Sequence, residues 1–182
     1  MHFLNADELE AGLPDILASP RDGGVVSMIV RRPDTDRREV LDSGELDIAE
    51  GLVGDNWRSR GSRMTADGSA HPEMQLNLMN ARVISLVARS RERWALAGDQ
   101  FLVDLDLAKE NLPAGTRLAM GSAIVEVTAV PHLGCKKFAA RFGLEAMKFV
   151  NSRRGKALCL RGINAKVVES GRVSTGDTIR RA

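Results

Sequence analysis

Short β-strand patterns separated by glycine turns recur along this chain and limit the folds it can adopt. The clearest is 122–130, a nearly continuous run of apolar and β-branched residues. The other segments with strand-like composition or alternation are 25–30, 38–41, 45–48, 74–79, 101–105, 157–160, 163–169 and 178–180. Many short strands with few helices between them are typical of a barrel and not of a βαβ sheet. We therefore predict a mainly β fold, a closed or nearly closed β-barrel.

Helical patterns are fewer and lie between these strands. Asn5, followed by Glu8 three residues later, has the pattern of a helix N-cap with a capping box. The other helical patterns are 80–97, with Asn80 as its cap, 136–142 and 144–150. We expect residues 1–23 to form an N-terminal helical lead-in and residues 24–182 to form a single barrel domain with a few added helices.

Composition excludes several classes of protein. Apolar residues make up 43% of the chain, enough for a proper core, whereas aromatic residues make up 4% and tyrosine is absent. Few aromatics argue against stacking on single-stranded nucleic acid. No apolar run reaches the length of a membrane span, the first residues are too acidic for a signal peptide, and two distant cysteines make no disulfide framework. We expect a cytoplasmic protein with reduced thiols and neither a membrane nor a nucleic acid as partner.

Positive charge is concentrated in the last part of the chain. Residues 131–182 contain twelve Lys or Arg and three Asp or Glu, a balance of +9. The first 130 residues hold the other fourteen and twenty-one, a balance of −7. Such a split predicts an anionic partner for the basic part, or two parts that fold against each other and compensate their charges.

Cys135 has a neighbourhood that favours a reactive thiol. It lies between a Pro/Gly turn and two lysines, at the start of a helical pattern, and both cations and a helix N-terminus lower the pKa of a thiol. His132, three residues earlier, could act as its base. The simpler interpretation is an ordinary loop cysteine beside solvated lysines. Cys159, in the strand-like segment 157–160, is expected in the core.

A series of short motifs relates the chain to a known family. The motifs are Gly51-Leu52-Val53-Gly54-Asp55, the strand entry Gly-Asp-Gln-Phe-Leu-Val at 98–103, Glu-Val-Thr at 126–128, Cys135-Lys136-Lys137-Phe138, Arg161-Gly162-Ile163, and the closing Gly171 to Asp177 segment. In this order and spacing they resemble the MOSC domain family, named after the C-terminal domain of molybdenum-cofactor sulfurase, over about residues 25–181.

The resemblance implies a pyruvate-kinase-like β-barrel and a site at the end of the long strand. It assigns to Cys135 the role of binding molybdenum in the molybdenum cofactor (molybdopterin) or of carrying sulfur as a persulfide. Asp99-Gln100 corresponds to a Glu-Asn element of the family. The family usually has proline before the cysteine, whereas this chain has Gly134, so we expect a more flexible loop here.

From this resemblance we expect an anionic cofactor in a basic pocket near Cys135. Four cations, Lys136, Lys137, Arg141 and Arg161, would hold its phosphate or oxo groups. Asp55, Asp99, Gln100 and His132 complete the expected cofactor site.

Two further functions remain open from the sequence. The first is a molybdenum-dependent reductase of N-hydroxylated compounds, which would need electron-transfer partners because no flavin or iron–sulfur motif is recognisable. The second is a non-catalytic module whose basic surface binds an anionic ligand or a partner. The resemblance brings no pyridoxal-phosphate site to these residues, so a persulfide on Cys135 would have to come from a sulfur donor.

Overall fold

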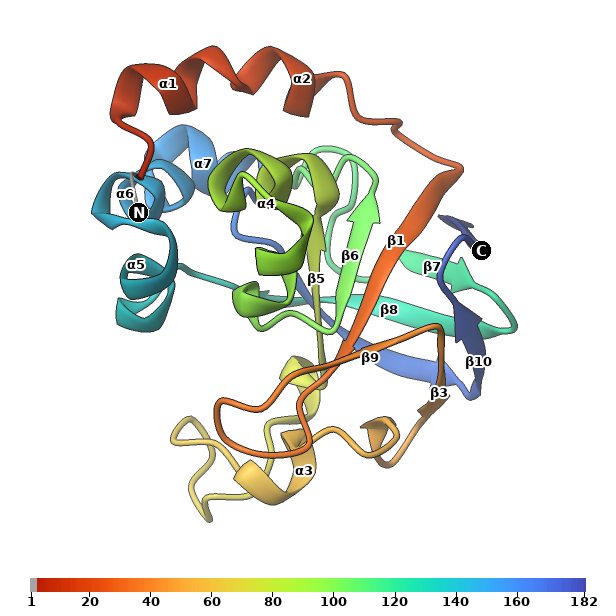
Figure 1. Ribbon diagram of the computed structural model, residues 1–182. Helices are drawn as coiled ribbons and strands as arrows, with labels where there is room; N and C mark the ends of the chain where they lie inside the picture. The colour runs from red at the N-terminus through yellow and green to blue at the C-terminus, as the bar shows by residue number, and fades with distance from the viewer. Residues whose placement is uncertain (1–2) are drawn as a thin grey trace.

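The computed structural model describes residues 3–182, and a closed seven-stranded barrel forms its centre (Figure 1). Around the ring the strands are β1 (Gly24–Arg31), β11 (Thr178–Arg181), β7 (Arg117–Met120), β8 (Ala123–Pro131), β9 (Ile163–Glu169), β5 (Leu76–Asn80) and β6 (Phe101–Asp104). The pairing of β1 with both β11 and β6 closes the ring. All pairs in the ring are antiparallel except β5 and β6. The predicted mainly β barrel is therefore confirmed.

Four smaller strands extend this ring or lie beside it. β2 (Glu39–Leu41) pairs with the end of β1, and β3 (Ser43–Asp47) lies between β10 (Gly171–Ser174) and β4 (Gly51–Leu52) in a separate sheet. Strand alternation explains the main core: along β8, Ala123, Val125 and Val127 are buried while the residues between them are partly exposed. These side chains fill the barrel together with those of the other strands.

Helices cover one side of the barrel and build a second core (Figure 1). They are α1 (Ala6–Ala11), α2 (Leu13–Leu17), α4 (Ala81–Ala88), the 3₁₀ helix η2 (Arg91–Ala97), α5 (Lys136–Phe142), α6 (Leu144–Asn151) and α7 (Arg153–Ala157). Two short helices, α3 (Trp57–Arg60) and the 3₁₀ helix η1 (Pro72–Met74), flank the long loop at the opposite end. Both predicted caps are present, with the capping box at Asn5 and Asn80 accepting from two backbone amides of α4. None of the helices in this described part is long and apolar enough to cross a membrane.

Two elements differ from the sequence prediction. The helix predicted over 80–97 is divided, because Arg89 adopts a left-handed conformation that ends α4 before η2 begins. The strand predicted at 157–160 is wrong: α7 continues to Ala157, and Cys159 has φ 49°, in the left-handed region. Alternating apolar residues there pack around a tight turn, since the chain must leave α7 and enter β9 within a few residues.

Gly162 controls how the chain enters β9, and its replacement gives a first testable expectation. Its φ is +114°, and a Cβ placed there would lie 2.2 Å from the backbone oxygen of Leu78. Gly176 also has a positive φ, +94°, but a Cβ would meet nothing within 4 Å. Gly162→Ala should therefore destabilise the protein by about 2 kcal/mol more than Gly176→Ala, because it adds a backbone clash to the shared φ strain. Urea unfolding of both variants measures the difference, and equal losses would contradict this account.

Candidate functional site

Asp99, Arg161 and a partly exposed His132 form a largely buried triad where the ends of three structural elements meet. Asp99 follows the Gly98 cap of η2, Arg161 directly precedes Gly162, and His132 follows the last residue of β8. Arg161 Nη1 donates to both carboxylate oxygens of Asp99, at 2.8 and 2.7 Å, and His132 Nε2 lies 2.8 Å from Asp99 Oδ1. The side chains of Asp99 and Arg161 are 0% and 7% exposed.

Arg161 also ties this triad to the helix that follows Cys135. Its guanidinium lies over the ring of Phe138 in α5, 5.0 Å from the centroid, and its Nη2 donates to the Ala97 backbone oxygen. Its Nε has no hydrogen-bond partner although it is buried. One donor of a buried, charged side chain is thus left available.

Charge and burial set the protonation states of the triad. Burial alone would raise the pKa of Asp99, but the positive charge of Arg161 and the contact with His132 outweigh it and the pKa is lowered. Burial and the charge of Arg161 lower the pKa of His132, although Asp99 acts in the opposite direction. At neutral pH the triad therefore contains a carboxylate, a guanidinium and a neutral imidazole that donates from Nε2.

This arrangement predicts a loss of stability in mild acid. The unfolded chain protonates His132 near its ordinary pKa of 6.5, whereas the folded chain takes up that proton only at lower pH, so acid favours unfolding. Between about pH 7.5 and about pH 5.5, His132 should remove about 1 kcal/mol of stability, while Asp99 stays ionised throughout this range. Urea unfolding of the wild type and His132→Gln at both pH values tests it. An unchanged pH slope in the variant would rule out His132 as the cause.

A second buried ion pair lies next to the triad. Asp55 accepts from Nε and Nη2 of Arg32, each at 2.8 Å, and also from the Arg32 backbone amide. Arg32 Nη1 donates to the Asn77 side chain and to the Gly98 backbone oxygen. Gln100, fully buried, donates to Asp55 and to the Gln75 oxygen and accepts from the Asn77 amide. Asp55 therefore fixes the position of the Arg32 side chain, and Gln100 in turn holds Asp55.

The arginines of these two ion pairs, Arg32 and Arg161, line a pocket of about 310 Å³, which we call the basic pocket. Its lining residues are Arg32, Asp34, Thr35, Asp36, Arg38, Asn56, Arg60, Met74, Asn77, Ala97, Gly98, His132, Lys137, Arg141 and Arg161. Six of these are Lys or Arg and two are Asp. Positive charge therefore dominates its walls.

The pocket holds polar atoms whose bonding capacity is not used. The three buried side-chain nitrogen or oxygen atoms without partners in residues 3–182 are Arg38 Nε, Asn56 Oδ1 and Arg161 Nε, and all three residues line the pocket. Burial, together with the charges of Arg141 and Arg32, lowers the pKa of Arg38. Unpaired buried donors and mutually repelling cations are the environment that an anion stabilises.

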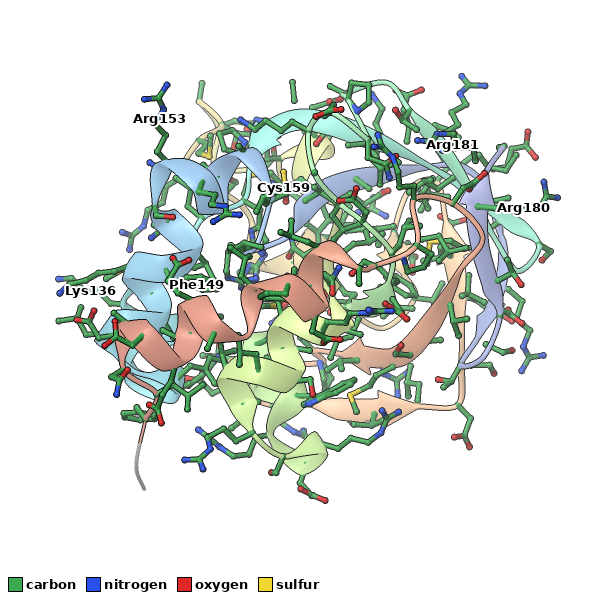
Figure 2. The ribbon with its side chains drawn as sticks, turned by 90° about the horizontal axis from the view of Figure 1, so that it is seen from above. Lys136, Phe149, Arg153, Cys159, Arg180 and Arg181 are labelled. Carbon is green, nitrogen blue, oxygen red and sulfur yellow. The ribbon has the colours of Figure 1, made fainter. Side chains whose placement is uncertain are left out.

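The structure brings together some of the predicted site residues and leaves others outside. His132, Lys137, Arg141 and Arg161 line the basic pocket, with Asp55, Asp99 and Gln100 behind it. Asp36 bonds Lys137 and Arg141 at the rim. Cys135 and Lys136 are exposed and do not line the pocket, and Figure 2 shows Lys136 projecting outward from α5.

Sequence reasoning missed half of the pocket's cations. Arg32, Arg38 and Arg60 come from the first 130 residues, the part with net negative charge, while the other three come from the basic part. The split in charge along the chain therefore does not predict which cations line the basic pocket. The two Arg-Arg pairs at 31–32 and 37–38, on either side of an Asp-rich turn, were the available signal.

The loop before Cys135 is held more firmly than Gly134 suggested. The Asn151 side chain accepts from the Gly134 amide and donates to the Gly134 oxygen, both at 2.9 Å. A proline at this position would lose the first of these bonds because it has no N–H. Here two hydrogen bonds from α6, and not a proline ring, fix the backbone next to the thiol.

The fold and the site together define a β-barrel protein with a pocket lined mainly by cations. A sequence profile of the MOSC domain matches residues 68–180, and the chain belongs to this family. A search of curated proteins gives no match. Within the described residues, no three His, Cys, Asp or Glu side chains are placed to hold a metal ion.

Solved structures share this fold at low sequence identity. The YuaD protein from Bacillus subtilis aligns with a TM-score of 0.60 and 17% identity, covering 86% of this chain and 93% of its own. YiiM from Escherichia coli aligns with a TM-score of 0.54 and 20% identity, covering 87% and 69%. YiiM from Geobacillus stearothermophilus aligns with a TM-score of 0.52 and 12% identity, covering 90% and 74%. Identity this low supports the fold alone.

Proposed function

We propose that this MOSC-family protein binds the molybdenum cofactor, with the phosphate of the pterin in the basic pocket. The observation that carries the proposal is the pair of unpartnered guanidinium donors, Arg38 Nε and Arg161 Nε, at a pocket lined mainly by cations. Oxyanions accept charge-assisted hydrogen bonds from such groups.

The carboxylates at the pocket do not compensate all of its positive charges, so a phosphate would be stabilised there. Arg32 and Arg161 are neutralised by Asp55 and Asp99, and Lys137 and Arg141 share Asp36. Arg38 and Arg60 remain without a carboxylate at ion-pair distance among residues 3–182, and burial lowers the pKa of both. A bound anion would supply the missing negative charge and accept from the free donors.

Cys135 is the residue that we propose to react with the cofactor or with sulfur. Its thiol is exposed at the start of α5, two residues before Lys137, which lines the pocket. When bound, the cofactor supplies a molybdenum centre, and thiolates suit soft metal chemistry. In the proposal Cys135 ligates that metal or carries a persulfide received from a donor protein, and the exposure of its sulfur leaves it open to such a partner.

Cofactor analysis of protein purified from a molybdopterin-producing host tests this function. We expect pterin to co-purify with the wild type, and Cys135→Ser to lose bound molybdenum or persulfide. Cys159→Ser is the matched control, because that thiol is partly buried on the far side of Arg161 and should leave both unchanged. Absence of pterin and persulfide from the wild type, with Cys135→Ser indistinguishable from it, would refute the proposal.

A further inference from the structure

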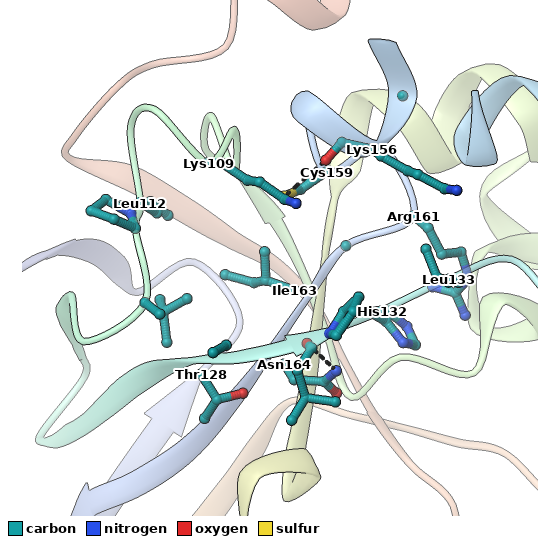
Figure 3. Close-up of a pocket in the computed structure, with 18 of the residues that line it drawn as sticks. Lys109, Leu112, Thr128, His132, Leu133, Lys156, Cys159, Arg161, Ile163 and Asn164 are labelled. Atoms are coloured by element: carbon teal, nitrogen blue, oxygen red, sulfur yellow. Dashed lines mark hydrogen bonds between the residues drawn. The ribbon is translucent and has the colours of Figure 1, made fainter. Parts of the chain in front are cut away.

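A second cavity, of about 520 Å³, lies beside the basic pocket, and we call it the apolar pocket (Figure 3). It is lined by residues from β8, β9, α7 and the 109–114 loop. Its apolar wall includes Leu112, Val127, Val130, Val150 and Ile163. Arg161 and His132 line both cavities and so form their common wall. A cavity of this size with mostly apolar walls and few polar groups is typical of small-molecule sites.

A break in the pairing of β8 with β9 opens this pocket. Val127 pairs with Ala165 and Pro131 pairs with Ile163, so residues 128–130 stand opposite Asn164 alone. The Asn164 side chain donates to the Val130 oxygen across the gap. All three residues of the bulge line the pocket. Bulges of this kind often lie next to functional sites, where they redirect side chains.

The charge around the apolar pocket favours an anion at its rim. No Asp or Glu is among its lining residues. Lys109 and Lys156 are exposed, and neither forms an ion pair within residues 3–182. In Figure 3 Lys109 extends toward Cys159. Burial raises the pKa of that thiol even though Lys109 acts in the opposite direction, so Cys159 contributes no negative charge.

The interior of the pocket favours a hydrocarbon chain. A buried water needs two to four polar partners, which the valine, leucine and isoleucine walls do not provide, so water there is readily displaced. The triad already satisfies most of the polar groups on the wall shared with the basic pocket. An occupant would thus contact apolar walls with its body and the two lysines with its head.

We propose that the apolar pocket binds a medium-chain aliphatic carboxylate, with its chain against Val127, Val150 and Ile163 and its carboxylate paired with Lys109 and Lys156. A neutral chain would leave the lysines unpaired, and a cationic head would be repelled by them. This site does not depend on the proposed molybdenum cofactor, since neither pterin nor metal takes part in it.

Titration of the protein with sodium decanoate below micelle formation, followed by calorimetry, tests this site. We expect saturable binding of one decanoate per chain. 1-Decanol should bind about tenfold more weakly, and decyltrimethylammonium should not bind at all, because each lacks the charge that the lysines select. No saturable binding, or equal binding of decanol, would overturn the proposal.

Two variants locate the site on the protein. Ala129→Trp fills the cavity from an exposed position of the bulge and should abolish decanoate binding. Lys109→Glu/Lys156→Glu should weaken it more than tenfold. Arg153→Glu/Arg180→Glu changes the net charge equally at surface positions away from the cavity and should bind decanoate as the wild type does (Figure 2). Circular dichroism and thermal melting verify that each variant folds. Undiminished binding by a folded Ala129→Trp would place decanoate elsewhere and refute the site.

Discussion

Replacing Asp99 with alanine should destabilise the protein by about 3–5 kcal/mol, because it leaves the buried Arg161 charge without its partner. Arg161 is 94% buried, and Asp99 bonds it through both oxygens. The same substitution removes the acceptor of His132. Since Arg161 also packs on Phe138, the loss should spread to α5 and to the loop that carries Cys135. Urea unfolding at neutral pH measures the change.

A second substitution distinguishes an unpaired charge from a general packing defect. Arg161→Met, added to Asp99→Ala, removes the uncompensated cation, so the double variant should be more stable than Asp99→Ala alone. The surface pair of Glu145 and Lys148 serves as the control, because Glu145→Gln breaks an exposed ion pair and should cost about 0.5 kcal/mol or less. A double variant less stable than Asp99→Ala would show that Arg161 stabilises the fold mainly by packing.

The second large effect concerns anion binding in the basic pocket. Arg38→Gln should weaken the binding of inorganic phosphate by about 10- to 100-fold, since it removes a charged side chain whose Nε has no hydrogen-bond partner in the described residues. The substitution should not reduce stability, because it also relieves repulsion from Arg141 and Arg32. Chemical-shift titration with phosphate, followed at the Gly98 amide beside the Arg38 side chain, measures the affinity.

Arg37→Gln provides the matched control for this experiment. Arg37 is the neighbour of Arg38 and carries the same charge, but it is exposed and does not line the pocket. Its loss should change phosphate affinity less than threefold, through long-range charge alone. If the two variants weaken binding equally, the effect is one of net charge, and the specific role of Arg38 Nε is refuted.

Sequence patterns predicted much of the secondary structure, because interactions between residues close in sequence decide it. The run of apolar and β-branched residues at 122–130 correctly predicted β8. Asn80 caps α4 as predicted, since a side-chain acceptor beside free helix amides needs no distant partner. The strand prediction for 157–160 was wrong because the alternation of apolar residues there was also compatible with a turn. Only tertiary packing decided between them, because Leu160 is buried in the helical core while Cys159 packs against the barrel core.

The site was predictable only in part, because its contacts join distant residues. Asp99 and Arg161 are 62 positions apart and Arg32 and Asp55 are 23 apart, and no periodicity relates such pairs. Family resemblance named Asp99, Arg161 and Cys135. It did not reveal Arg38, whose proposed role rests on a buried Nε without a hydrogen-bond partner.

The sequence by itself determined a mainly β barrel with capped helices and a cysteine after its longest strand, because hydrophobic alternation and turn residues act over a few positions. The tertiary structure alone decided which charges meet. Closing the barrel brings the ends of β1, η2 and β8 to one place, where Asp55 and Asp99 neutralise Arg32 and Arg161, while Arg38 Nε stays without a hydrogen-bond partner. The same closure, with the bulge opposite Asn164, opens the apolar pocket, since pairing register depends on both strands.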